Sequence, residues 1–139
     1  SVRKSPKEDL FTIINHKNEL FLYDSIKDTV LKIDRSKHEF MDCNWSPDGK
    51  YITYSCSVNS RCAIIKIYDI REDKRFNITK PVNKDYLPVF DPKGKYLVLI
   101  SIVTARKSNG VSSPLFTTVP CDFFSKLFSF KSSLCPSKL

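Results

Sequence analysis

Two histidines, His16 and His38, carry the side chains best suited to acid–base or nucleophilic chemistry near neutral pH. Glu39 and Asp42 lie close to His38 in the sequence, and a serine, a histidine and an acid form the catalytic triad of many hydrolases. The spacing does not by itself assemble such a triad, and His16 lies in a stretch typical of a hairpin turn. We therefore interpret both histidines as structural and predict no catalytic residue.

Ligands for a metal or a cofactor are also missing at useful spacings. His38 and Cys43 could begin a metal site, but a third and a fourth ligand do not follow at the usual short intervals. The sequence contains no GxSxG, GxxxxGK[ST] or HExxH motif, and only three glycines argue against glycine-rich phosphate loops. Asp48 lies in a turn that recurs along the chain, which explains this carboxylate without catalysis. We expect no cofactor and no metal, and substrate-binding residues stay unknown.

The charge of the chain is positive but evenly mixed over most of its length. Its 139 residues include 23 Lys+Arg and 15 Asp+Glu, a formal net charge of +8. Basic and acidic residues alternate in stretches such as Arg71–Arg75, which favours a solvated surface over a nucleic-acid interface. No run reaches the roughly 18 apolar residues of a membrane-spanning helix, and Ser1–Leu10 is too polar for a secretory signal. We expect neither nucleic acid nor a membrane as a partner.

The cysteine pattern points to a reducing compartment. The five cysteines are Cys43, Cys56, Cys62, Cys121 and Cys135. An odd number without CxxC spacing argues against a disulfide framework and against a zinc ribbon. Cys56 and Cys62 are close enough for a bridge across a hairpin, but nothing requires one. Reduced thiols in a cytoplasmic protein are the expected state.

An internal repeat of 45 residues defines the elements that would position any site. Trp45–Ile52 (WSPDGKYI) recurs as Phe90–Leu97 (FDPKGKYL). Leu22–Asp24 recurs at the same offset as Ile67–Asp69. In the first motif proline presets the second position of a turn, and Gly49 supplies the left-handed residue that closes it. Flanking runs rich in β-branched and aromatic residues predict strands on both sides of each turn.

These runs predict an all-β fold built from antiparallel, four-stranded units. The expected strands are Phe11–Asn15, Glu19–Tyr23, Thr29–Ile33, Phe40–Trp45, Tyr51–Ser57, Ala63–Tyr68, Arg75–Ile78, Leu87–Phe90 and Tyr96–Ser101. Four short strands in about 40–50 residues are typical of a β-propeller blade. We predict blades at about 1–37, 40–80 and 85–101, which amount to two and a half blades of an incomplete ring. An open arc leaves strand edges and blade faces uncovered, so we expect marginal stability or aggregation.

The repeat stops after Ser101. Residues 102–139 contain eight serines, five phenylalanines and one acid, and they carry half of the net charge. Phe123–Phe130 could form one or two turns of an amphipathic helix. The tail as a whole is predicted to be irregular, either disordered or non-native to the propeller.

The repeat also resembles a known family. WSPDGK at Trp45–Lys50 resembles the signature of the TolB-like, or PD40, propeller repeat. Asp85–Leu97 resembles the tricorn version of that repeat, because Phe90-Asp91 stands where most PD40 repeats have Trp-Ser. Further stretches similar to tricorn propeller sequence are Ile33–Lys37, Asp42–Ser46 and Ala63–Asp69. Over about residues 8–101 the chain is thus similar to the N-terminal β-propeller region of the tricorn protease family.

The resemblance implies a cytoplasmic serine protease that degrades oligopeptides, with propellers that admit and sieve peptides through axial channels. In that family a PDZ-like domain and a catalytic domain follow the propellers, and neither is present in this sequence. We therefore expect a noncatalytic propeller fragment, with peptides as partners and other propeller segments or subunits completing the ring. The alternative is a TolB-like protein–protein interaction module unrelated to proteolysis. A third interpretation is a pseudogene product without a stable function.

Overall fold

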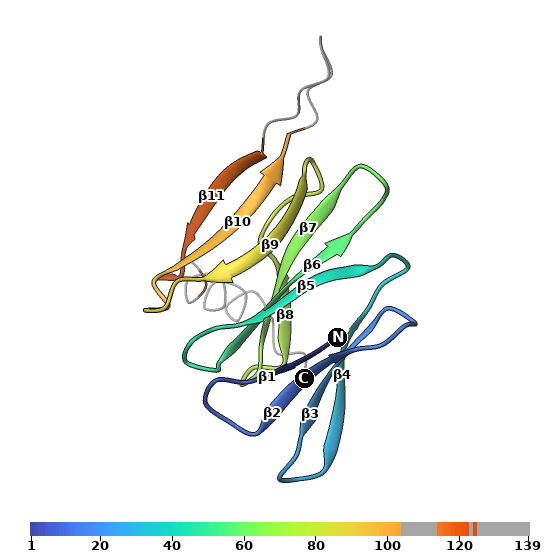
Figure 1. The fold of residues 1–139 in the computed structure, drawn as a ribbon, viewed down its shortest axis with the longest axis vertical. Coiled ribbons are helices and arrows are strands. Elements are labelled where there is room, and N and C mark those ends of the chain that lie inside the picture. Colours follow the sequence, from blue (N-terminus) through green and yellow to red (C-terminus); the bar gives the residue numbers. More distant parts are fainter. Residues whose placement is uncertain (104–113, 123, 125–139) are drawn as a thin grey trace, which may run out of the picture.

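The computed structural model describes residues 1–103, 114–122 and 124, and these residues form eleven β-strands (Figure 1). The strands are β1 Val2–Lys4, β2 Leu10–Ile14, β3 Glu19–Asp24, β4 Thr29–Arg35, β5 Phe40–Trp45, β6 Tyr51–Ser57, β7 Ala63–Asp69, β8 Lys74–Asn77, β9 Lys84–Phe90, β10 Tyr96–Ile102 and β11 Pro114–Pro120. The predicted all-β fold with antiparallel blades is confirmed, and every predicted strand is present with ends that differ by a few residues at most.

The strands form three consecutive blades. Blade 1 is the antiparallel sheet β1 to β4 in sequence order, and blade 2 repeats that order with β5 to β8. Blade 3 consists of β9, β10 and β11, again antiparallel and in sequence order. A single parallel pair, Ala63 with Lys84, connects β7 to β9 and links blades 2 and 3 into one seven-stranded sheet.

All three blades share one register where the second strand begins. The paired residues are Leu10 with Asp24 in blade 1, Tyr51 with Asp69 in blade 2 and Tyr96 with Pro120 in blade 3. The partners are 14, 18 and 24 residues apart in the sequence, so the hairpins between the second and third strands differ in length. Second strands of blades 1 and 2 are therefore offset by 41 residues, although their third strands are offset by 45.

The N-terminal segment contains a strand and a turn that the sequence analysis did not predict. β1 pairs with β2, and the Ser5 N–H donates to the Leu10 carbonyl at 2.8 Å. The Ser46 N–H makes the equivalent bond to the Tyr51 carbonyl at 2.9 Å. Ser46–Tyr51 and Asp91–Tyr96 are the repeated turns found in the sequence, which we call the landmark turns, and Ser5–Leu10 is thus a third copy. This copy was hidden in the sequence because it lacks glycine and follows the 41-residue offset.

Part of the segment predicted to be irregular belongs to blade 3. β11 pairs with β10 over seven residues, and Phe124 is 1% exposed. The structure therefore differs from the expectation for Pro114–Pro120 and Phe124. The hairpin was hidden because its connection is longer than in blade 2, and because a proline at each end of β11 argues against a strand. Most of the predicted Phe123–Phe130 helix lies outside the described residues.

Two apolar cores lie between the blades. The core between blades 1 and 2 includes Leu20, Ile52 and Tyr54, all with 0% exposure. The core between blades 2 and 3 includes Ile65 and Leu97, also with 0% exposure. Because blade 2 is covered on both faces, β6 and β7 are buried at nearly every position. This burial explains why their sequences do not alternate between apolar and polar residues.

Candidate functional site

The landmark turns of blades 2 and 3 share one backbone geometry. The Gly49 N–H donates to the Ser46 carbonyl and the Gly94 N–H to the Asp91 carbonyl, both at 2.9 Å. Gly49 has a φ of 74° and Gly94 a φ of 68°, in the left-handed region that favours glycine. The predicted role of these glycines in closing the two turns is therefore confirmed.

Different side chains stabilise the two turns. In blade 2, Ser46 Oγ accepts the Tyr51 N–H at 2.9 Å and donates to Asp48 Oδ1 at 2.6 Å. In blade 3, Asp91 Oδ1 accepts the Tyr96 N–H directly, at 2.7 Å. That bond, together with other backbone N–H groups, holds the pKa of the Asp91 carboxyl below its usual range. One carboxylate thus replaces a serine–aspartate pair, and Asp48 serves the turn as predicted.

A cavity of about 340 Å³ opens between these two turns. It is lined by Lys7, Ser46, Pro47, Asp48, Tyr51, Phe90, Pro92, Lys93, Gly94 and Cys121. Burial, with the nearby charge of Asp91, raises the pKa of the Cys121 thiol to about 11. Cys121 is therefore protonated at neutral pH and is not a thiolate nucleophile. The lining combines the side chains of both turns with the aromatic rings of Tyr51 and Phe90.

The third strands of blades 1 and 2 end in a repeated tyrosine–aspartate contact. Tyr23 Oη donates to Asp28 Oδ1 at 3.1 Å, and Tyr68 Oη donates to Asp73 Oδ1 at 2.8 Å. Both aspartates have positive φ, 51° and 49°. Sequence reasoning found the tyrosines but missed the aspartates, which recur at the same 45-residue offset. The contact fixes the turn to the fourth strand, and it is structural.

A buried carboxylate connects blade 1 to blade 2. Asp34, at the end of β4, is 7% exposed and lies 2.9 Å from Lys66 Nζ and 2.6 Å from an Arg75 guanidinium nitrogen. Tyr54 Oη donates to Asp34 Oδ2 at 2.9 Å, the same oxygen that Lys66 contacts, whereas Arg75 contacts Oδ1. Burial alone would raise the pKa of the Asp34 carboxyl, but Lys66 and Tyr54 together hold the pKa below its usual range. Sequence reasoning missed this cluster because it occurs at one joint only.

The first strands of blades 2 and 3 lie against each other and are joined by side-chain contacts to the backbone. Asp42 Oδ2 accepts the Leu87 N–H at 3.1 Å, and Asn44 Nδ2 donates to the Pro88 carbonyl at 2.7 Å. Leu87 has a φ of 52°, which is rare for a bulky residue and marks a strained backbone. Its side chain is 41% exposed, and Met41 on β5 is 38% exposed. We call the surface formed by β5 and β9 the inner edge. Its strained backbone and exposed apolar groups make it a candidate binding surface.

The structure separates the histidine-based candidates of the sequence. His16 lies exposed in the turn between β2 and β3, and His38 lies exposed between β4 and β5. Cys43 is buried, and burial raises the pKa of its thiol to about 11. Asp42 is occupied by Ser55 and Leu87. Among the described residues, no group of three or more His, Cys, Asp or Glu side chains is placed to hold a metal ion.

Cys56 and Cys62 are not bridged, and neither are the other described cysteines, Cys43 and Cys121. Cys135 lies outside the described residues. In the part of the chain that the structure describes, no helix is long and apolar enough to cross a membrane.

Sequence comparisons find relatives among tricorn proteases. The chain is 31% identical over 101 residues to a tricorn-like protease C-terminal subunit of Sulfurisphaera tokodaii, which covers 72% of this chain and 12% of that protein. It is 30% identical over 101 residues to a tricorn protease homolog of Saccharolobus solfataricus, covering 72% of this chain and 9% of the relative. The chain thus spans about a tenth of the length of these relatives. No family model matches it.

Structural comparisons find β-propellers. A crystal structure of the tricorn protease superposes with a TM-score of 0.72 at 20% identity, over 86% of this chain and 13% of that one. A TolB structure from Agrobacterium tumefaciens superposes with a TM-score of 0.61 at 17% identity, over 86% of this chain and 44% of that one. At such identities the superpositions establish the fold alone.

The blades, their shared register and their repeated turns define a segment of a β-propeller. Within that fold, the predicted resemblance to the tricorn protease family is confirmed by the sequence relatives.

Proposed function

We propose that this chain is a noncatalytic part of a tricorn-like serine protease that degrades oligopeptides in the cytoplasm, and that its blades help to gate peptides. The observation that carries the proposal is the match of about 30% identity over 101 residues to tricorn proteases. Apolar side chains exposed on β5 and β9 support a role in contacting peptides.

The inner edge of blades 2 and 3 is the surface that would contact a peptide. First strands of propeller blades surround the central channel, and β5 and β9 are the first strands here. Met41, Leu87 and Val89 expose 38%, 41% and 49% of their surface on these strands. Apolar groups on a rigid, strained backbone suit the side chains of an extended peptide.

The proposal is tested by peptide binding and by activity of the purified chain. Fluorescence anisotropy of labelled, unstructured oligopeptides should report saturable binding, and Leu87→Lys should weaken it about tenfold, or ~1.4 kcal/mol. Val58→Lys, at an exposed position in the turn between β6 and β7, is the matched control and should leave binding unchanged.

The same samples should neither hydrolyse fluorogenic oligopeptides nor react with a serine-directed fluorophosphonate probe. Labelling of a specific serine would contradict the noncatalytic assignment. A folded chain that binds no peptide would contradict the gating role and would favour the alternative, a TolB-like module that binds another protein. That alternative is supported by the TolB superposition over 86% of the chain.

A further inference from the structure

The connections between strands lie at two opposite ends of the blades. One end holds the connections that follow β2, β4, β6 and β8, which are residues 15–18, 36–39, 58–62 and 78–83. Backbone hydrogen bonds join neighbouring connections there: the Ser36 N–H donates to the Asn18 carbonyl at 3.0 Å, and the Ala63 N–H donates to the Asn83 carbonyl at 3.2 Å. We call the surface formed by these four connections the basic end.

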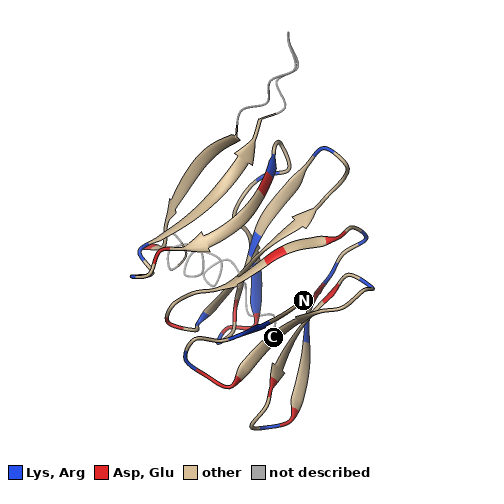
Figure 2. Cartoon of the chain, viewed as in Figure 1, with Lys and Arg blue, Asp and Glu red and all other residues tan. Residues whose placement is uncertain are grey.

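The fold separates charges that the sequence mixes. The charged residues in the four connections of the basic end are Lys17, Lys37, Glu39, Arg61 and Lys80. At the opposite end, where the landmark turns lie, every described connection contains acids, which are Glu8, Asp9, Asp28, Asp48, Glu72, Asp73 and Asp91. Figure 2 shows blue at the tips of the turns on the right and a mixture of red and blue at those on the left. Positive charge therefore dominates one end of the described blades only.

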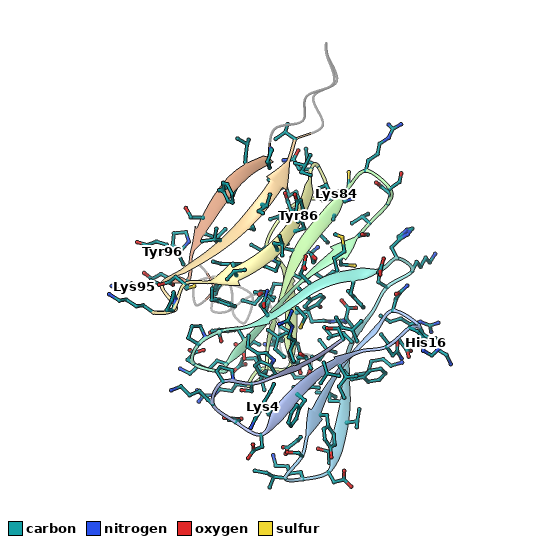
Figure 3. All side chains as sticks on the ribbon, viewed as in Figure 1. Lys4, His16, Lys84, Tyr86, Lys95 and Tyr96 are labelled. Carbon is teal, nitrogen blue, oxygen red and sulfur yellow. The ribbon has the colours of Figure 1, made fainter. Side chains whose placement is uncertain are left out.

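A cavity of about 530 Å³ opens at the basic end, where the β2–β3 turn meets the end of β4. It is lined by Lys17, Asn18, Arg35, Ser36 and Lys37, which we call the basic pocket. In Figure 3, His16 marks this side of the molecule. The charged members of the lining are all cations, held around one hollow.

Hydrogen bonds fix the backbone of the basic pocket. Asn15 Oδ1 accepts the Lys17 N–H at 2.9 Å and the Glu19 N–H at 3.0 Å. Asn18 has a φ of 57°, a left-handed value that asparagine tolerates better than most residues. The bond from the Ser36 N–H to the Asn18 carbonyl then ties the turn to the β4–β5 connection. A ligand would therefore meet a backbone that is already ordered, which lowers the entropy cost of binding.

The cations of the basic pocket are available to an anion. Glu19 pairs with Arg35 across β3 and β4, but its carboxylate contacts Lys32 Nζ at 2.7 Å. Within the described part of the chain, Lys17, Arg35 and Lys37 form no ion pair. Like charges gathered in a hollow concentrate the positive potential there and attract negative groups.

The side chains indicate which anion fits. The planar guanidinium of Arg35 matches the two oxygens of a carboxylate or a phosphate group. The cavity is larger than one such group needs and falls in the range of about 300–1,000 Å³ that is typical of ligand sites. The four connections of the basic end contain no Phe, Tyr or Trp on which the bases of a nucleic-acid strand could stack. These features favour an acidic peptide segment over a nucleic acid.

We propose that the basic pocket docks an acidic segment of a partner protein. Arg35 pairs with one oxyanion of that segment, a carboxylate or a phosphate group, and Lys17 and Lys37 balance its remaining negative charge. The pocket centres on the end of β4, the fourth strand of its blade, whereas the inner edge is formed by first strands. The docking site is thus separate from the surface proposed to gate peptides and does not depend on that function.

Fluorescence anisotropy of the full chain with labelled peptides tests the docking site. A hexaglutamate peptide should bind saturably, and more weakly as the salt concentration rises, whereas hexaglutamine should not bind. Arg35→Gln should weaken hexaglutamate binding about tenfold, and Arg35→Lys, which keeps the charge but loses the planar fork, should weaken it less. Lys37→Gln is a second variant with an expected loss of several-fold. Lys95→Gln removes the same charge from an exposed turn at the opposite end, and this matched control should bind like the wild type (Figure 3).

A peptide with phosphoserine at alternate positions separates the two sources of the oxyanion. Tighter binding than hexaglutamate would assign phosphate groups, and weaker binding would assign carboxylates. Circular dichroism checks that each variant is folded. The proposal would be overturned by a folded wild type that binds neither acidic peptide, by equal losses in Arg35→Gln and Lys95→Gln, or by a single-stranded oligonucleotide of equal charge that binds more tightly than both peptides.

Discussion

The two joints of the arc use the same strands and turns but different buried polar contacts. Between blades 1 and 2, Asp34 is buried with Lys66, Arg75 and Tyr54 around it. Between blades 2 and 3, the residue in register with Asp34 is Thr79, whose Oγ1 accepts the Ile65 N–H at 3.0 Å. An apolar cluster packs at that joint beside the buried Asp85, which accepts a hydrogen bond from Ser101. The repeat thus specifies the shape of a blade, while positions outside the landmark motifs specify which blades pack together.

This difference implies that each joint has its own partner preference. A buried ion pair is weak evidence for stability, because desolvation offsets much of the attraction, but an unmatched charge is strongly disfavoured. Blade 2 therefore fits against blade 1 and not against a face without a carboxylate. The joint between blades 2 and 3, which we call the apolar joint after its main cluster, depends chiefly on the packing of that cluster.

The largest effect is expected from emptying the apolar joint. Leu97→Ala should lower the free energy of unfolding by about 3 kcal/mol, since it leaves a cavity in a fully packed core. Denaturant unfolding measures the loss, and Leu97→Met, which conserves volume, is the control and should cost less than about 1.5 kcal/mol. Equal losses for both variants would show that the joint is not tightly packed.

Breaking the charged joint should have a slightly smaller effect. Asp34→Asn leaves Lys66 and Arg75 without their acid, and the expected loss is about 2 kcal/mol, reduced from that of a fully buried pair because Arg75 is half exposed. Thr79→Asn, at the matched position of the other joint, should cost less. The same denaturant titrations report both values, and a larger loss at Thr79 would reverse the comparison.

The charged joint should also make stability depend on pH. The pKa of Asp34 is lowered in the folded state, so its contribution is fully present above the unfolded value of about 3.9 and is lost as the pH falls through the lower folded value. The difference in unfolding free energy between wild type and Asp34→Asn should therefore shrink below about pH 4. A difference that stays constant down to pH 2 would contradict the assigned ion pair.

The two turn glycines should differ in a smaller but measurable way. Alanine at either position is strained by positive φ, at a cost of about 1 kcal/mol. At Gly49 a Cβ would also meet Lys7 Cβ and Ser5 Oγ at 3.2 Å, whereas at Gly94 the nearest atom, in Pro47, is 3.8 Å away. Gly49→Ala should therefore melt at a lower temperature than Gly94→Ala. If Gly49→Ala melted at the higher temperature, the close packing of Gly49 against Ser5 and Lys7 of blade 1 would be contradicted.

The smallest effect concerns Trp45 and Phe90, which occupy the same place in the two landmark turns. Trp45 Nε1 is buried without a hydrogen-bond partner, and such a donor costs free energy. Trp45→Phe removes that donor and some apolar contact together, so we expect the unfolding free energy to change by less than about 1 kcal/mol. Phe90→Trp, the reciprocal change, should destabilise more. A large loss in Trp45→Phe would indicate that the indole N–H has a partner.

The repeat made most of the fold predictable, because turns and buried strands leave local patterns. Gly49 and Gly94 are required by backbone geometry, and their spacing revealed the blades. The Ser5 turn was missed because it closes without glycine. β11 was missed because a long connection separates it from β10 and because it has a proline at each end.

The joint chemistry was not predictable from the sequence. Asp34 and Lys66 are 32 residues apart, and neither recurs at the next joint, so only the packing of two sheets brings them together. The positive φ of Leu87 likewise follows from a bulge that Asp42 of the neighbouring blade stabilises. Spacing identifies what repeats, whereas the contacts that distinguish one joint from another are long-range.

Residue-resolved amide hydrogen exchange of the purified chain tests the stacked-blade arrangement most directly. The account predicts that amides of β6 and β7 exchange most slowly, because blade 2 is covered on both sides, and that amides of β2–β4 and β9–β11 open at lower free energy. Exchange in β6 and β7 as fast as in the outer blades would contradict it.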